Sequence, residues 1–186
     1  FQAAPLYFEI GDLSGYRKHC EAMISKFGAT QDPAIAERIA KAYTISPAPE
    51  DDLKTASQLV DLALSKNDPN PAYFQAVKGM VEYRQGHFES AIEWTRKAVS
   101  KEGQVATRDV QAYMVCAMAN HQTKRFEEAK TALAKGLAIA ETKLPKLESG
   151  DVGKGCDWHD WLIAHILIRE AKTLFESTSA LPESAK

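Results

Sequence analysis

Thiol, imidazole and carboxylate side chains lie close together near the C-terminal end of the chain, at Cys156, His159 and Asp160. Zinc sites in proteins are built from these three kinds of ligand. A structural zinc site uses about four ligands, and no second Cys/His pair stands at a comparable spacing here. Asp157 and Asp160 also match a capping box at the start of a helix. We therefore expect no bound metal.

Three cysteines and five histidines could in principle supply a Cys/His nucleophile. The sequence around them shows no strained turn and no backbone cradle for an oxyanion, so we expect no catalytic residue, no cofactor and no enzymatic activity. The cysteines are scattered and odd in number, at Cys20, Cys116 and Cys156. This pattern argues against a disulfide framework and favours a reducing, cytoplasmic location.

The 186 residues include 23 basic and 25 acidic side chains, which leaves a net charge of −2. A chain with this balance has no general basic field that would attract nucleic acid or an anionic membrane. The longest strongly apolar run, from Trp161 to Ile168, is far shorter than the roughly 20 residues that span a bilayer. We expect a soluble protein without a nucleic-acid or membrane partner.

Two segments, Tyr73 to Val99 and Tyr113 to Leu137, share one spacing of small and aromatic residues. Two antiparallel helices approach closely only where a side chain is nearly absent, so this spacing predicts a helical hairpin in each segment. The matching positions are Gly79 and Ala117, Phe88 and Phe126, Ala91 and Ala129, and Ala98 and Gly136.

The same spacing of small residues, called the repeat frame below, extends towards the N-terminus. The alanines Ala56, Ala91 and Ala129 stand 35 and 38 residues apart, and Gly11-Asp12-Leu13 mirrors Gly86-His87-Phe88. No stretch alternates like a strand, so we expect an all-α fold. We expect a single domain over 1–186, excised from a longer protein, with hairpins at about 1–27, 33–66, 71–101 and 106–143, a loop at 144–156 and a terminal helix at 157–177.

These residues resemble the tetratricopeptide repeat superfamily, best from Ala72 to Ser100 and again from Val110 to Leu137. The segments Asp157 to Ala164 and Ala36 to Ala42, with Gly11-Asp12, are also similar to a helical segment that some bacteria fuse to Ser/Thr protein kinase domains or WD40 propellers. The resemblance implies a right-handed superhelix of hairpins with a C-terminal capping helix. It also implies a non-catalytic interaction or scaffolding module that holds a protein or peptide partner in its concave face.

The repeat frame places one set of side chains on the inner face of the first helices. A stripe of methionine and tyrosine there suits an adaptable groove, because methionine repacks easily. The alternative is that the stripe is core, packed against the terminal helix or the neighbouring repeat. The expected partner-binding residues are Tyr73, Met80, Tyr83, Arg84, Met114, Met118 and His121.

The terminal helix is apolar around nearly its whole circumference from Trp161 to Ile168, so it must be buried on two sides. We expect Trp161 to face inward and the edge around Ile163 and Leu167 to be available for contacts outside the domain. This gives a second hypothesis for the function, a regulatory or dimerising appendage. Its terminal helix would dock on a parent domain or on a second copy, as in a homodimer.

Overall fold

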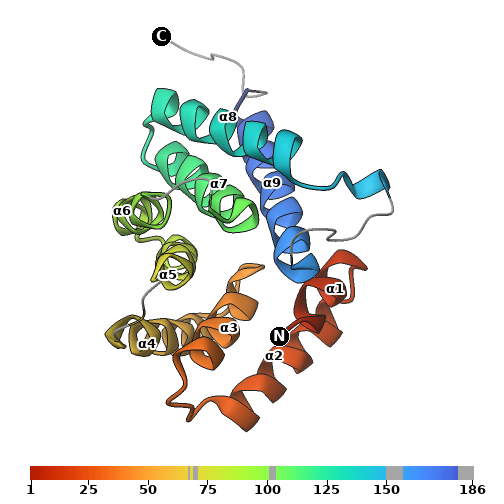
Figure 1. Ribbon diagram of the computed structural model, residues 1–186, viewed down its shortest axis with the longest axis vertical. Helices are drawn as coiled ribbons and strands as arrows, with labels where there is room; N and C mark the ends of the chain where they lie inside the picture. Colours follow the sequence, from red (N-terminus) through yellow and green to blue (C-terminus); the bar gives the residue numbers. More distant parts are fainter. Residues whose placement is uncertain (67, 69–70, 101–103, 150–156, 180–186) are drawn as a thin grey trace.

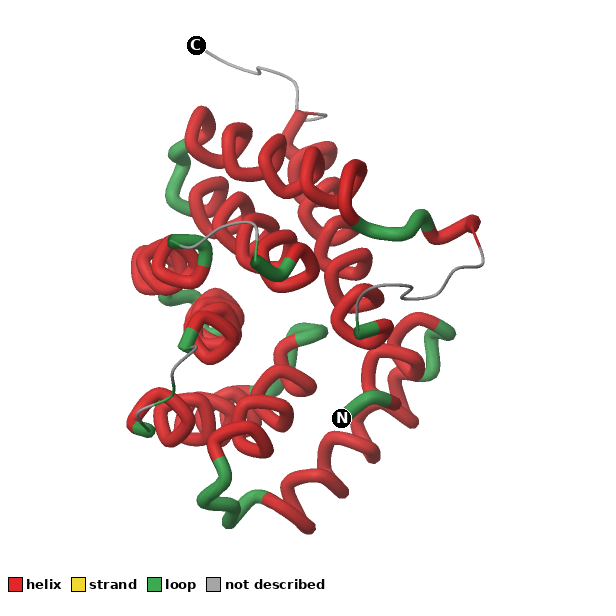
Figure 2. The backbone as a smooth tube through the Cα atoms, in the orientation of Figure 1, coloured by secondary structure: helices red, strands yellow, loops and turns green. Residues whose placement is uncertain are grey.

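The computed structural model describes residues 1–66, 68, 71–100, 104–149 and 157–179. Within these ranges the chain is all helical and contains no β-strand, which confirms the expected all-α class (Figures 1 and 2). The helices are α1 (Ala3–Glu9), α2 (Leu13–Phe27), α3 (Pro33–Thr44), α4 (Glu50–Ser65), α5 (Ala72–Arg84), α6 (Phe88–Ala98), α7 (Ala106–Gln122), α8 (Phe126–Lys143) and α9 (Trp158–Ser179), with a short 3-10 helix at Leu147–Ser149.

Successive helices pack in pairs, α1 with α2, α3 with α4, α5 with α6 and α7 with α8. The first helices of the last three pairs, α3, α5 and α7, also pack on one another. The second helices α4 and α6 each contact the first helix of the next pair. The last helix, α9, packs on α7 and on α1, so the two ends of the row of hairpins meet through it (Figure 1).

Three of the hairpin turns share one backbone device, a left-handed residue after the first helix. This residue is Gly11 (φ 77°), Gly86 (φ 79°) or Lys124 (φ 61°). The amide of Gly86 donates to the carbonyl of Tyr83 at 3.0 Å, and the next amide donates to the carbonyl of Glu82 at 2.9 Å. The other two turns have the same pair of bonds, which is the Schellman arrangement that ends a helix.

The small residues in the repeat lie where the helices of a hairpin cross. A Cβ atom added to Gly79 would lie 2.6 Å from Cγ2 of Thr95 on the facing helix. A Cβ atom added to Gly136 would lie 2.9 Å from Cβ of Tyr113. Ala91 is completely buried, as is Ala129. Close approach of antiparallel helices is therefore the reason for the repeated spacing.

Caps and prolines set the ends of the second hairpin. The Asp32 carboxylate accepts hydrogen bonds from the amides of Ala34 (2.8 Å) and Ile35 (3.1 Å), and Pro33 takes the first helical position. At the other end of α3, Pro47 and Pro49 keep the chain extended until α4 begins. The helices thus lie close to their expected positions. Part of the expected loop, 150–156, and Lys101 of the third hairpin lie outside the described residues.

Candidate interaction surface on the inner face of the hairpins

The inner face of the hairpins, formed by α3, α5 and α7, carries the side chains that hold α9. Nearly every side chain from Trp161 to Ile168 is buried, and only His165 is half-buried. The indole nitrogen of Trp161 donates to the carbonyl of Pro145 at 2.7 Å, which fixes the start of α9 to the chain that follows α8. The helix occupies the face on which a partner was expected.

Arg84, at the end of α5, holds α9 through polar contacts. Its guanidinium group forms a two-pronged ion pair with Glu170, in which Nη2 lies 2.7 Å from Oε2. The same group donates to the backbone carbonyls of Thr44 (2.9 Å) and Ile45 (3.2 Å) at the end of α3. A single planar fork thereby joins three helices in a fixed geometry.

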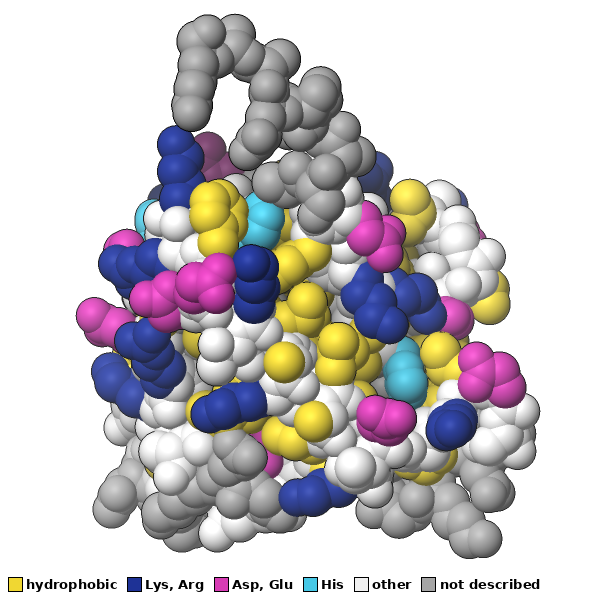
Figure 3. Space-filling view, turned by 90° about the horizontal axis from the view of Figure 1, so that it is seen from above, with side chains coloured by type: hydrophobic (Ala, Val, Ile, Leu, Met, Phe, Trp, Pro, Cys, Tyr) yellow, Lys and Arg dark blue, Asp and Glu magenta, His cyan; other side chains and the backbone are white. Residues whose placement is uncertain are grey.

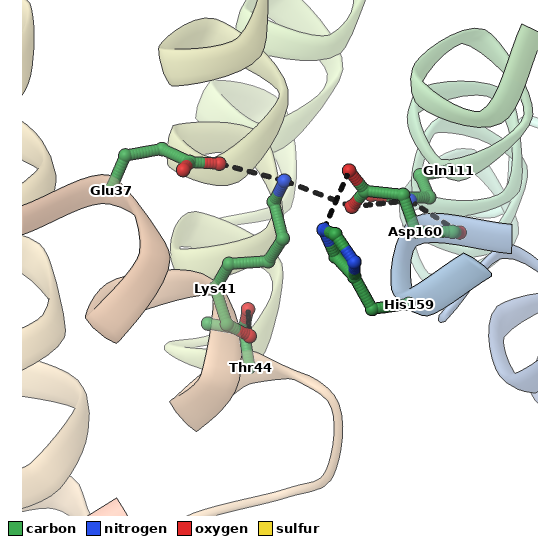
Figure 4. A network of polar contacts seen from close by, with 6 residues as sticks. All are labelled: Glu37, Lys41, Thr44, Gln111, His159 and Asp160. Atoms are coloured by element: carbon green, nitrogen blue, oxygen red, sulfur yellow. Dashed lines mark hydrogen bonds and ion pairs between the residues drawn. The ribbon is translucent and has the colours of Figure 1, made fainter. Parts of the chain in front are cut away.

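A second anchor lies at the N-terminal end of α9, where Lys41 of α3 stands between two carboxylates (Figure 4). Its ammonium nitrogen is 2.7 Å from Oε1 of Glu37 and 3.1 Å from Oδ1 of Asp160. Gln111 of α7 donates to the Asp160 backbone carbonyl at 2.9 Å and to its side chain at 3.3 Å. All four side chains are buried. This polar cluster therefore ties α3, α7 and α9 together inside the molecule.

Charge in this cluster is shared between one cation and two acids. Burial alone would lower the pKa of Lys41, but the carboxylates of Glu37 and Asp160 raise it above its ordinary value. Burial also raises the pKa of Glu37, although Lys41 opposes this change. Lys41 therefore stays charged and is compensated on both sides, which a buried ammonium group requires.

Three of the seven expected partner-binding residues belong to the core. Met80, Met114 and Met118 are 1%, 0% and 0% exposed, respectively. Met114 packs over Gly136, between the two helices of the last hairpin. The methionine stripe therefore follows the alternative interpretation, in which methionines at helical spacing fill the core. These side chains contact no partner in this arrangement because other parts of the chain cover them.

The other four expected residues line the contact with α9 or lie next to it. The His121 ring centroid is 4.8 Å from that of Phe175 on α9, and the Tyr83 ring packs beside Phe88 at 5.7 Å. Tyr73 is half-buried, with the ammonium nitrogen of Lys41 5.5 Å from its ring centroid. Arg84 contacts α9 directly through its ion pair with Glu170. The role of these four residues in binding a partner stays a prediction.

The outward edge expected on α9 is internal. Ile163 is 0% exposed and Leu167 is 1% exposed, and Trp161 is buried as well. The prediction that Ile163 and Leu167 are available for contacts outside the domain is therefore wrong. The helix meets α7 on one side and α1 on the other, and these two neighbours satisfy its need for burial on two sides.

His159 lies at the rim of the polar cluster. Its Nε2 atom is 3.7 Å from Oδ2 of Asp160, and its Nδ1 atom is buried without a hydrogen-bond partner among the described residues. Burial lowers its pKa below the ordinary value; Asp160 and Asp157 oppose this effect, whereas Lys41 and Arg38 add to it. The ring is held largely neutral in the folded chain.

His165 is a second half-buried histidine of α9, and it lies near α1. Burial lowers its pKa, the backbone carbonyl of Pro145 opposes the shift, and the charge of Arg169 adds to it. The charges of Glu9 and Glu148 also raise its pKa. Its Nε2 atom is buried and has no hydrogen-bond partner in the described part of the chain. Protonation of His159 or His165 would therefore act against the seating of α9.

Only some of the residues that could bind a metal can be shown to lie close together. Ligand atoms of Asp157, His159 and Asp160 lie within 4.8 Å of one another, whereas Cys156 lies outside the described residues. A cation here would stand close to the ammonium group of Lys41, 3.1 Å from Asp160, and at the positive N-terminal end of α9. Both charges weigh against metal binding, and its absence stays a prediction.

The described cysteines have the chemistry of core residues. Cys20 and Cys116 are both buried and unpaired. Burial raises the pKa of Cys20 to about 12 and also raises that of Cys116. A nucleophilic cysteine needs the opposite shift, towards the thiolate, so neither thiol fits that role.

Two features of the sequence are related to the packing of α3, α7 and α9, although helical periodicity alone does not reveal it. Glu37 and Lys41 stand four residues apart on α3, a spacing at which glutamate and lysine form an ion pair. In α7, no charged side chain occurs from Val110 to Asn120, which indicates a helix covered on every side. Neither feature identifies Asp160 as the second acid beside Lys41.

No family model, curated protein or solved structure matches the chain. No described helix has the length and apolar character needed to cross a membrane. On the face seen in Figure 3, acidic and basic side chains intermingle around a central group of apolar ones, and neither sign of charge dominates. The features of the chain that bear on a function are therefore the inner face and its contacts with α9.

Proposed function

We propose that the chain is a non-catalytic interaction module of the tetratricopeptide type, a right-handed superhelix of hairpins whose concave inner face is a groove for one helix. The main support is the seating of α9, because apolar contact along its length is combined with the Arg84 and Lys41 anchors at two separate points. An amphipathic or apolar helix laid in a groove is a common way for such modules to bind proteins.

In this proposal α9 fills the groove of the free chain. A partner protein supplies a helix that is apolar like α9 and takes its place. That helix carries an acid near its start, to meet Lys41, and a second acid about ten residues later, to meet Arg84. The spacing follows from Asp160 and Glu170 of α9. A reducing, cytoplasmic location remains part of the proposal and rests on the scattered cysteines.

A labelled peptide of residues 157–179 tests whether the groove accepts a helix. The receiving protein is the full chain with Asp160→Asn and Glu170→Gln, which loosen its own α9 at both anchors. We expect this variant to bind the peptide, and the unaltered chain to bind it much more weakly because its groove is filled. Fluorescence anisotropy gives both affinities.

Two controls make the test specific. A peptide with Leu167→Glu places a charge at a fully buried position and should not bind. Adding Arg84→Gln to the receiving chain should weaken binding of a peptide that keeps Glu170. Equal binding of the normal and the Leu167→Glu peptide would show that the inner face does not select a helix, and would contradict the proposed function.

A further inference from the structure

A separate cavity of about 300 Å³ opens at the joint between the first and second hairpins. Its inner wall consists of the buried side chains of Tyr16, Cys20 and Tyr43, and its outer wall is the proline-containing loop 47–49. This loop separates the end of α3 from the start of α4, while α2 packs on α3. The volume is at the small end of the range for ligand sites, which suits a group the size of one side chain.

The two tyrosines differ in their hydrogen bonds. The Tyr16 hydroxyl donates its proton to the backbone carbonyl of Ala42. Tyr43 is 4% exposed and lines the cavity, and its hydroxyl makes no hydrogen bond within the described residues. A polar group in such surroundings favours a ligand that offers it a hydrogen bond.

The mouth of the cavity carries two acids and one base. Glu21 and Asp52 come from different helices, α2 and α4, and neither makes an ion pair with any described residue. Burial raises the pKa of Asp52, and the neighbouring charges of Glu21 and Asp51 raise it further. Arg17 is exposed and supplies the one positive charge of the lining. The lining therefore carries two negative charges against one positive charge, and a cationic ligand would relieve the repulsion between the two carboxylates.

We propose that this cavity binds the end of an aliphatic cation, an alkylammonium or guanidinium group carried either by a small free amine or by a side chain of a partner protein. The aliphatic stem lies against the tyrosine, cysteine and proline walls. The cationic group lies between Glu21 and Asp52 and donates a further hydrogen bond to the Tyr43 hydroxyl. Tyrosine rings add to the attraction, because their faces are electron-rich. An anion is repelled at the mouth, and a neutral molecule of the same shape gains nothing from the acids. This site is independent of the groove that holds α9.

Titration of the full chain with n-butylammonium, followed by amide NMR shifts, tests the proposal, with n-butanol and butyrate as ligands of matched shape. We expect saturable shifts in α2 and α4 for butylammonium alone. The double variant Glu21→Gln and Asp52→Asn should bind about tenfold more weakly, because two weak ion pairs are lost. Tyr43→Phe should weaken binding by a few fold, because only the hydroxyl is removed.

A matched control is Glu93→Gln, which removes an exposed acid from α6, far along the chain from the cavity. Its affinity should equal that of the unaltered chain. Amide spectra of every variant establish that the fold is kept. Similar binding of n-butanol and butylammonium, or an unchanged affinity in the double-acid variant, would overturn the proposal.

Two tripeptides distinguish the sources of the cation. Acetyl-Gly-Lys-Gly-amide presents lysine in a chain, and its norleucine analogue lacks the charge. If the lysine peptide binds more tightly than butylammonium, the ligand of the cavity is a side chain of a partner protein. If it binds more weakly, the ligand is a free amine. The proposal is contradicted if the norleucine peptide binds as well as the lysine peptide.

Discussion

Lys124 occupies a backbone position that glycine takes in two equivalent turns. Its φ of 61° lies in the left-handed region, where an L-residue with a side chain is strained. At Gly11 and Gly86 no atom lies within 4 Å of an added Cβ, so backbone conformation, rather than steric space, favours glycine there. The repeat thus tolerates a lysine at one turn at the expense of some stability.

Lys124→Gly should stabilise the chain by roughly 0.5–1 kcal/mol, because the strain is removed while the two turn hydrogen bonds remain. The matched change Gly86→Ala should destabilise it by about 1 kcal/mol or more, since it introduces the same strain without a steric clash. Urea denaturation measures both. A Lys124→Gly variant that is less stable than the unaltered chain would show that the lysine side chain contributes more than its backbone costs.

We expect acid to weaken the seating of α9 through protonation of His159 and His165. Both have a folded-state pKa lowered mainly by burial, so the unfolded chain binds more protons near and below the ordinary value of 6.5. Their contribution is therefore fully present above pH 6.5 and is lost as the pH falls below that value. We expect the melting temperature to decrease from pH 7 to pH 5. With His159→Gln and His165→Gln together, the decrease should be smaller.

Measurement at pH 8 is the control for this comparison, because both histidines are neutral there in the folded and the unfolded chain. Any difference in melting temperature at pH 8 reports packing alone and is subtracted. If the double variant loses stability between pH 7 and pH 5 as steeply as the unaltered chain, the two histidines do not govern the acid response.

At the scale of the helices, the alanines Ala91 and Ala129 are the strongest test of the repeat frame. Each is completely buried near the start of a second helix. Replacement of either by glutamate should unfold the hairpin stack or lower its stability by several kcal/mol, because a charge would be buried without a partner. Thermal melts measure the loss. Ala134→Glu, at an exposed position of α8, is the matched control and should melt like the unaltered chain.

Most helix positions could be predicted because their signals are local. Asp32 and Pro33 start α3, the glycines at 11 and 86 end α1 and α5, and the spacing around Gly79 indicates a close helix crossing. Each of these features depends on a few neighbouring residues. A local pattern therefore identifies the helices without any knowledge of how they assemble.

The arrangement of α9 could not be predicted in the same way. Its composition indicates burial on two sides but does not identify the surfaces that cover it. The bond between Lys41 and Asp160 joins residues 119 positions apart, and no periodicity relates residues so far apart in sequence. For the same reason the edge at Ile163 and Leu167 was expected outside, whereas α1 and α7 enclose it.

At the scale of the whole molecule, α9 closes the row of hairpins onto its own first helix. α1 has seven residues, too few to be stable as an isolated helix in water. It packs on α2 and α9, and Arg169 of α9 forms an ion pair with Glu9 of α1. The stability of the first hairpin is therefore coupled to the seating of the last helix.

Leu167→Glu should break this closure, because the side chain is 1% exposed and lies among apolar neighbours. The exposed Lys172→Glu on the same helix is the control for a change of charge. We expect Leu167→Glu to lower the melting temperature strongly, with no change in the oligomeric state measured by light scattering. A dimer that dissociates in this variant would mean that the edge is an interface after all.

Hydrogen exchange of the Leu167→Glu variant would then show the order in which the helices unfold. Because α1 depends on α9, amides of α1 and α9 should lose protection before those of the three hairpins from α3 to α8. These hairpins keep their mutual contacts when α9 leaves, since their pairing does not pass through it. Uniform loss of protection across α3 to α8 together with α1 and α9 would show instead that α9 is part of one cooperative core. The inner groove would then not be open to another helix without unfolding of the whole chain.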